Sequence, residues 1–268
     1  MSAKIPTVKE LFKAGAHVGH LRSKTDARSR DFIYVFKNKI AVIDLDQTVE
    51  QIKKATDFLN SKAEEGGLVL FSGTKLQAKG KVKEVAEKLK MPYVNERWPG
   101  GLITNFPVVS KSIKKMIKTE KDIEENKYED LKKKERLIIQ RGLDKSRLIF
   151  DGLRGLERLP DVVFLVDAKE EDIAVLEAKA KGIPVVALCD TNTNPNNIDY
   201  PIVINDDSMK SIAMVLDVIV SEFEKNYKPK VVDTGVEKRV DKAMSKAKEL
   251  KPVVKKEVKK NDKKTKKS

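Results

Sequence analysis

Two short apolar runs separated by a helical pattern constrain the fold of this chain most. The runs cover residues 162–166 and 183–188, and neither alternates apolar with polar side chains. Strands of this kind are buried on both faces, as in a parallel sheet that helices cover. The segment between them, 170–181, is rich in alanine and stops at Gly182, a residue common at helix ends. The pattern therefore predicts a β-α-β unit with a right-handed crossover.

The alternation of strand and helix continues on either side of this unit. Further strands are expected at 68–71, 91–94 and 200–204, and further helices at 46–63, 75–89 and 208–225. Asp46 or Thr48 is the expected cap of the first of these helices. In the 170–181 helix, the spacing predicts that Ile173, Leu176, Glu177 and Ala180 face the sheet. The order predicts an α/β fold with a mostly parallel sheet and helices on both faces.

The first 45 residues carry a less regular pattern. A capping box at Thr7 and Glu10 predicts a short helix, and the glycines and histidines that follow predict a tight, irregular segment. Two strands are expected at 32–36 and 40–45, joined at 37–39 as a hairpin against the sheet.

Residues 106–154 change to a long, highly charged helical pattern. Val109, Ile113, Met116 and Ile117 form one apolar stripe, and Tyr128, Leu131 and Ile138, with Leu137 beside it, form a second. The bend is expected at 125–127. Two such helices predict an antiparallel coiled-coil hairpin. It is inserted into an α/β domain made of residues 1–105 and 155–227.

The net charge of +14 is concentrated near the end of the chain. Residues 228–268 hold 16 Lys/Arg and 6 Asp/Glu, a net charge of +10, and lack an apolar period. This composition predicts a disordered, lysine-rich tail that binds a polyanion, nucleic acid before membrane. A purely solubilising tail is the alternative.

The single cysteine and the lack of long apolar runs bear on the compartment. Cys189 ends an expected buried strand and is interpreted as a small buried residue, so a disulfide framework is excluded. No apolar stretch approaches the length of a membrane span, and the N-terminus lacks a signal core. A cytoplasmic location is expected.

Histidines and strand-end aspartates form the first candidate site. His17 and His20 could bind a metal ion together with Asp190 or Asp206, although two histidines three residues apart do not complete a ligand set. Local hydrogen bonding is the favoured alternative. Carboxylates at strand ends also cap helices and hold turns, so catalytic residues are not assigned.

Two turns offer sites for nucleic acid. Residues 72–75 lie between a strand and a helix N-terminus, where an anion is favoured, but they are too short for a P-loop. They fit a backbone phosphate and a simply capped helix equally well. Arg97 and Trp98 could stack on a base, although Trp98 as an anchor of its glycine-rich loop is the favoured interpretation.

Short motifs occur in a fixed order along residues 5–225. They are Gly15, His17, Gly19 and His20; Ile43, Asp44 and Leu45; Gly73, Thr74 and Lys75; Arg97, Trp98, Gly100 and Gly101; Thr104 and Asn105; Leu159, Pro160 and Asp161; Gly182, Ile183 and Pro184; Asp190, Thr191 and Asn192; and Asn205, Asp206 and Asp207. Together they resemble the bacterial ribosomal protein S2 family of the small subunit, with the helical insertion at the family's place.

The resemblance implies a flavodoxin-like domain with a protruding coiled coil. It further implies a structural protein that binds 16S ribosomal RNA at the junction of head and body and helps to dock a large multi-domain RNA-binding protein. Neither enzymatic activity nor a cofactor, a small-molecule substrate or a membrane comes with it. Segments 21–31 and 157–158 depart from the family pattern.

Basic side chains in four regions are the candidates for phosphate contacts, which position a protein on RNA without reading its sequence. They are Arg22, Lys24, Arg28, Arg30, Lys75, Lys79, Arg97, Lys111, Lys114, Lys115, Lys118, Arg141 and Lys145. Two rival functions remain. One is an enzyme that binds a sugar phosphate or nucleotide on the same fold, and the other is a protein adaptor that uses the coiled coil.

Overall fold

The computed structural model describes residues 5–228 of the chain. The predicted tail, apart from Lys228, lies outside the described residues.

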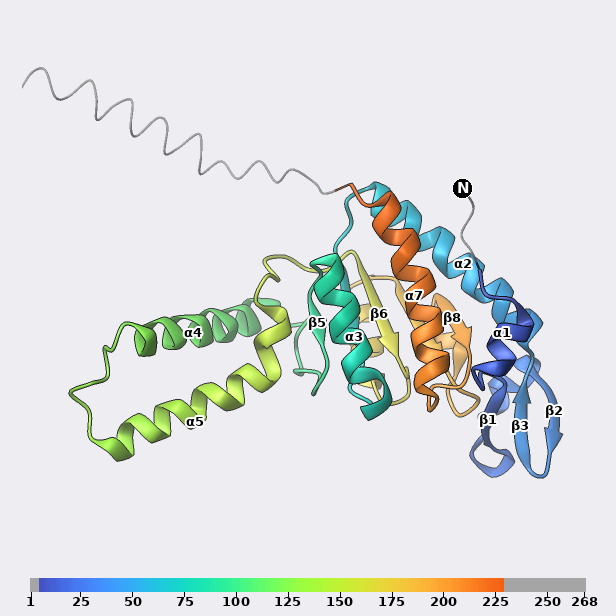
Figure 1. Ribbon diagram of the computed structural model, residues 1–268, viewed down its shortest axis with the longest axis horizontal. Coiled ribbons are helices and arrows are strands. Elements are labelled where there is room, and N and C mark those ends of the chain that lie inside the picture. The colour runs from blue at the N-terminus through green and yellow to red at the C-terminus, as the bar shows by residue number, and fades with distance from the viewer. Residues whose placement is uncertain (1–4, 229–268) are drawn as a thin grey trace, which may run out of the picture. The chain divides into compact units, whose positions relative to one another are not determined.

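A parallel sheet with the strand order β5-β4-β6-β7-β8 forms the centre of the fold (Figure 1). Its strands are β4 (Val69–Ser72), β5 (Tyr93–Val94), β6 (Val162–Val166), β7 (Val185–Cys189) and β8 (Tyr200–Val203). Every pairing within it is parallel, and every side chain of β6 and β7 is buried. The expected α/β fold is confirmed, and burial on both faces explains why these strands do not alternate.

Helices and a loop cover the two faces of this sheet. The helices α2 (Leu45–Glu64), α3 (Leu76–Leu89) and α7 (Met209–Asn226) share one apolar core with Phe71 and Phe164. On the other face, α6 (Asp172–Ala180) and the loop around Trp98 pack with Val163 and Leu165. Neighbouring residues of β6 thus point into different cores, as a strand requires.

The cap of α2 differs from the expectation. Asp44, not Asp46 or Thr48, caps the helix, because its carboxylate accepts from the backbone N–H groups of Asp46 and Gln47 at 3.1 and 3.5 Å. The Thr48 hydroxyl instead donates to the Val203 carbonyl at 2.7 Å. Thr48 therefore fixes α2 against β8.

A second, antiparallel sheet with the order β1-β3-β2 follows the short helix α1 (Val8–Lys13). Its strands are β1 (Val18–Leu21), β2 (Ile33–Lys37) and β3 (Ile40–Ile43), and the 3-10 helices η1 (Arg22–Lys24) and η2 (Ala27–Phe32) connect β1 to β2. The predicted hairpin is confirmed. Its turn residues Asn38 and Lys39 have φ values of 50° and 65°, as a tight two-residue hairpin turn requires. Strand β1 was not predicted, because its four residues carry no strand pattern.

Residues 106–153 form the expected helical hairpin, made of α4 (Phe106–Glu124), α5 (Lys133–Phe150) and η3 (Asp151–Leu153). Val109, Ile113 and Met116 are buried, which confirms the first stripe. The second stripe is wrong, because Ile138 is 61% exposed and Leu137 is 48% exposed. Instead, Leu143 is the buried side chain of α5. The prediction started the second helix at Tyr128, whereas α5 begins only at Lys133. Its buried face is therefore rotated relative to the predicted stripe.

The predicted inner face of α6 is also wrong in part. Ile173 and Leu176 are 53% and 65% exposed, whereas Ala174, Val175, Glu177 and Ala178 are buried. The small alanines let the helix approach the sheet closely. The Glu177 carboxylate is buried because backbone N–H groups of the loop around Trp98, which precedes α4, donate hydrogen bonds to it.

Candidate functional site

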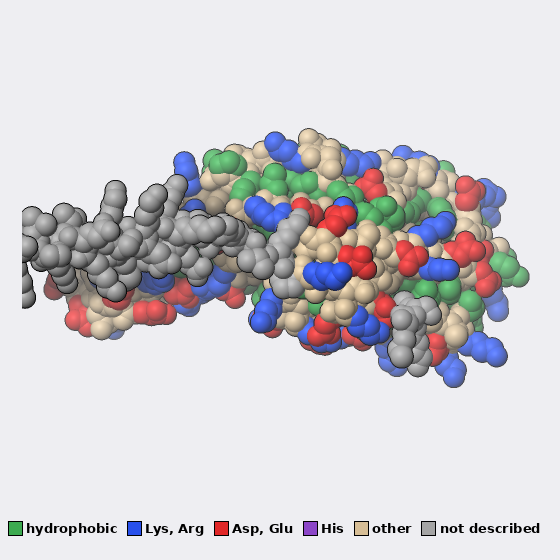
Figure 2. Space-filling model, turned by 90° about the horizontal axis from the view of Figure 1, so that it is seen from above, with side chains coloured by type: hydrophobic (Ala, Val, Ile, Leu, Met, Phe, Trp, Pro, Cys, Tyr) green, Lys and Arg blue, Asp and Glu red, His purple; other side chains and the backbone are tan. Residues whose placement is uncertain are grey.

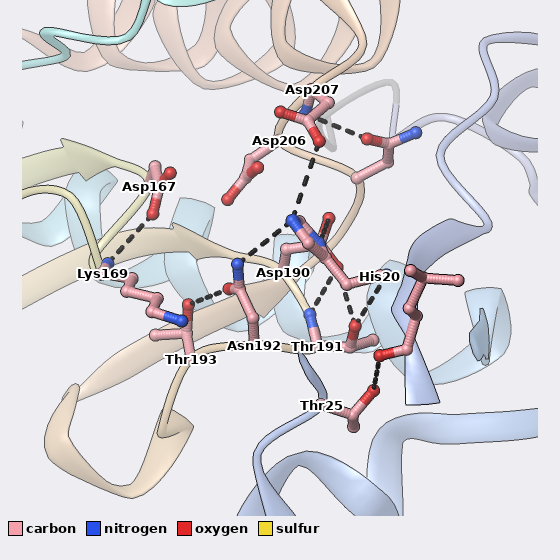
Figure 3. A network of polar contacts seen from close by, with 12 residues as sticks. His20, Thr25, Asp167, Lys169, Asp190, Thr191, Asn192, Thr193, Asp206 and Asp207 are labelled. Carbon is pink, nitrogen blue, oxygen red and sulfur yellow. Dashed lines mark hydrogen bonds and ion pairs between the residues drawn. The ribbon is translucent and has the colours of Figure 1, made fainter. Parts of the chain in front are cut away.

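The carboxyl ends of β4, β6, β7 and β8 bring charged side chains together (Figure 3). Lys75, in the turn after β4, lies 3.3 Å from an Asp167 oxygen and 2.5 Å from oxygens of both Asp206 and Asp207. Burial and Asp167 raise the pKa of Asp206 to about 7, against the opposing effect of Lys75. Burial lowers the pKa of Lys75, but its hydrogen bonds to the two aspartates outweigh that effect and raise it. The positive charge of Lys75 is thus paired with carboxylates of the protein itself.

His20 connects the small sheet to this cluster (Figure 3). Its Nδ1 lies 3.0 Å from an Asp190 oxygen, and its Nε2 lies 3.1 Å from the amide nitrogen of Asn192. Its backbone N–H donates to the Thr191 hydroxyl at 3.0 Å. The hydrogen bond with Asp190 raises the pKa of His20 although burial lowers it. Strand β1 is therefore held against the loop after β7 through polar contacts.

The predicted metal candidates are only partly brought together. His20, Asp190 and Asp207 offer ligand atoms within 4.8 Å of one another. His17 instead stacks on Phe12, with ring centroids 4.0 Å apart, and Asp206 binds Lys75. Both ring nitrogens of His20 already have protein neighbours, since Nδ1 lies beside Asp190 and Nε2 beside Asn192.

The turn 72–75 also differs from an open phosphate site. The Thr74 N–H donates to the Glu171 carboxylate at 3.0 Å, and Lys75 faces the aspartates. Acidic side chains of the chain itself therefore occupy the surroundings of this helix N-terminus.

Most of the other candidate cations are exposed. Lys111, Lys114, Lys115 and Lys118 lie at i, i+3, i+4 and i+7 of α4, which places them on one side of that helix. Arg28 binds Asp26 at 3.0 Å and Lys79 binds Glu96 at 2.6 Å. Within residues 5–228, the following candidates are exposed and form no ion pair: Arg22, Lys24, Arg30, Arg97, Lys111, Lys114, Lys115, Lys118, Arg141 and Lys145.

Trp98 is 7% exposed and donates its indole N–H to Glu177 at 3.2 Å. It is therefore an anchor of its loop, as favoured from the sequence, and is not free to stack on a base. On the side of the molecule in Figure 2, Lys/Arg and Asp/Glu side chains are intermingled.

One surface was missed by sequence reasoning. The outer face of the small sheet exposes large apolar side chains, namely Val18, Leu21, Tyr34, Val35 and Ile40. Register shifts between Ile33 and Val35, where Tyr34 sits 78% exposed, mark a bulge that turns this side chain outward. The sequence predicted a hairpin at 32–36 and 40–45, but it did not indicate which face of that hairpin stays exposed.

Comparison with known proteins decides the family. The family model described as "Ribosomal protein S2" matches residues 11–225. The chain belongs to the ribosomal protein S2 family. A relative from Cytophaga hutchinsonii, named small ribosomal subunit protein uS2, is 43% identical over 81% of this chain and 85% of its own.

Relatives of the same name come from other bacteria as well. Those from Coprothermobacter proteolyticus and Dictyoglomus thermophilum are each 41% identical, over 80% and 79% of this chain and 80% and 86% of their own. The S2 family match thus includes both the α/β body and the hairpin. Among residues 5–228, no helix has the length and apolar character to cross a membrane.

Proposed function

We propose that this protein is a structural RNA-binding constituent of the small ribosomal subunit, without enzymatic activity. Its membership of the S2 family carries the proposal, because the relatives are named small ribosomal subunit proteins. The proposed location is the cytoplasm, within the ribosome. The proposed partner is 16S ribosomal RNA near the junction of head and body, and the proposed roles are subunit assembly and translation.

The hairpin supplies the main RNA contacts in this proposal. The four α4 lysines extend over two helical turns, opposite the buried Val109, Ile113 and Met116. Arg141 and Lys145 lie one turn apart on α5. Phosphate contacts of this kind position the protein, while the shape of the RNA selects the place.

We further propose that the outer face of the small sheet binds a protein, the large multi-domain RNA-binding neighbour. Aliphatic side chains gain little from phosphates, but they form the cores of protein interfaces. Arg22, Lys37 and Lys39 lie at the hairpin-turn end of this face, where the Arg22 N–H donates to the Lys39 carbonyl at 2.7 Å. Within the part of the chain that the structure describes, these three cations form no ion pair. A partner with apolar and acidic side chains fits this surface.

Among the residues that the structure describes, the strand ends offer the rival enzymatic function no open phosphate site. At the strand ends, where such a fold binds ligands, Lys75 is surrounded by aspartates and Thr74 is bound to Glu171. A phosphate there would meet buried negative charge. The geometry therefore favours the structural role.

Salt-dependent RNA binding of two matched variants tests the proposal. Lys114→Ala with Lys118→Ala removes two cations of α4, and Lys53→Ala with Lys54→Ala removes two exposed cations of α2. If both α4 side chains contact phosphates, the slope of log K against log salt falls by about 1.4–1.8. The α2 pair should leave it unchanged. Equal slopes for all three proteins would contradict the assignment of α4.

Incorporation into subunits tests the wider role. The full chain should co-sediment with small subunits that lack it and protect 16S ribosomal RNA near the head–body junction from chemical probing. Failure to co-sediment would contradict the proposal as a whole.

A further inference from the structure

The chain order of the central sheet reverses between β4 and β6. Parallel α/β sheets bind ligands outside the carboxyl ends of their strands at such a switch point. In this protein the turn 72–75 and the start of α6 meet there. Glu171, the residue before α6, is 2% exposed, and its Oε1 accepts from the Thr74 N–H at 3.0 Å.

The start of α3 would otherwise favour a bound anion. Its N-cap residue, Lys75, provides no side-chain hydrogen bond to the first turn, and the helix dipole is positive at this end. The turn is packed tightly, since a Cβ on Gly73 would lie 2.8 Å from Val82 Cγ2. The backbone therefore holds the Thr74 N–H in a fixed position, and a carboxylate meets it.

We propose that Glu171 is a built-in anion, which takes the position at the switch point where this topology can hold an oxyanion ligand. The carboxylate joins the β4–α3 turn to the start of α6 across two neighbouring strands. It also closes the place to phosphates, because Asp167, which is 6% exposed, adds negative charge nearby. Burial raises the pKa of Glu171 and the hydrogen bonds from Thr74 oppose that effect, as expected for a carboxylate enclosed by protein.

Chemical rescue of a cavity variant tests this inference. Glu171→Ala in the full chain removes the carboxylate and leaves space for a small one. In chloride its melting temperature should fall by about 4–8 °C, because the Thr74 N–H loses its charged partner. Replacing chloride by formate at matched ionic strength should restore part of that loss. The wild-type protein should melt at the same temperature in both salts.

Two further variants keep the test decisive. Glu170→Ala removes the exposed neighbouring carboxylate and should melt like the wild type in either salt. Glu171→Gln fills the space with a neutral amide, so formate should not rescue it. If Glu171→Ala fails to fold in chloride, its refolding yield in formate and in chloride becomes the measurement.

Two outcomes would overturn the inference. They are an unchanged melting temperature of Glu171→Ala and equal behaviour of that variant in formate and chloride.

Discussion

Glu177 accepts a hydrogen bond from the indole N–H of Trp98 at 3.2 Å. The same carboxylate accepts from the backbone N–H groups of Gly101, Ile103 and Thr104 at 2.7, 2.9 and 3.0 Å. One side chain of α6 thus organises the loop that leads into α4. Burial raises the pKa of Glu177, but the hydrogen bonds outweigh this effect and lower it below the ordinary value.

We predict that Glu177→Gln lowers the free energy of unfolding by roughly 2–3 kcal/mol, because an amide cannot accept all of these hydrogen bonds. Denaturant unfolding measures the loss, and hydrogen exchange should locate it at residues 98–105. Glu170→Gln, at an exposed position, is the matched control. Equal stabilities would show that the loop is held by its apolar contacts alone.

Acid should weaken the attachment of the hairpin. Hydrogen bonds from Arg154, with help from Arg147, lower the pKa of Glu120 to about 2 from its ordinary 4.5. The stabilising contribution is therefore fully present above pH 4.5 and disappears as the pH falls toward 2. The difference in stability between the wild type and Glu120→Gln should shrink over this range. Amide hydrogen exchange of α5 measures that difference. A difference that does not depend on pH would contradict the prediction.

Two glycines of the hairpin should respond in opposite ways to alanine. A Cβ on Gly152 would lie 2.3 Å from the Tyr93 carbonyl oxygen, whereas one on Gly142 would meet nothing within 4 Å. Gly152→Ala should cost about 1–3 kcal/mol through the clash with β5. Gly142→Ala, inside α5, should stabilise by about 0.5–1 kcal/mol. Thermal melts of both variants check the pair, and a harmless Gly152→Ala would mean that the hairpin exit can shift.

The basic end of the chain should act through salt-dependent affinity. Residues 228–268 carry +10 of the net charge of +14. If they meet about five phosphates, a chain that ends at Tyr227 should show a slope of log K against log salt lower by about 3.5–4.5. Its melting temperature should match that of the full chain. A lower melting temperature would show packing on the body, and equal slopes would leave only a solubilising role.

The parts that local patterns dictate were predictable from the sequence. The strands β6 and β7 are apolar because both faces are buried, so their runs identified a parallel sheet. The first stripe of the hairpin, with Ile113, followed helical periodicity in the same way. These features depend on neighbours along the chain.

Errors arose where distant residues decide the role of a side chain. Leu176 was placed on the inner face by its type and is exposed. Glu177 was placed there by its spacing and is buried, but its partners, donors that lie more than 70 residues earlier, were not predictable. The ion pairs of Lys75, which stays a candidate for a phosphate contact, were also not predictable, because its aspartate partners come from the ends of β6 and β8. Sequence spacing contains no information about such partners.

Side chains of α2 form hydrogen bonds with the backbone of Val203 in the edge strand β8. The Val203 N–H donates to the Gln51 side chain at 2.7 Å, and its carbonyl accepts from the Thr48 hydroxyl at 2.7 Å. An edge with free backbone groups invites another strand and promotes aggregation. Because both the N–H and the carbonyl of Val203 are already hydrogen-bonded, this residue offers no free backbone group to which another strand could add.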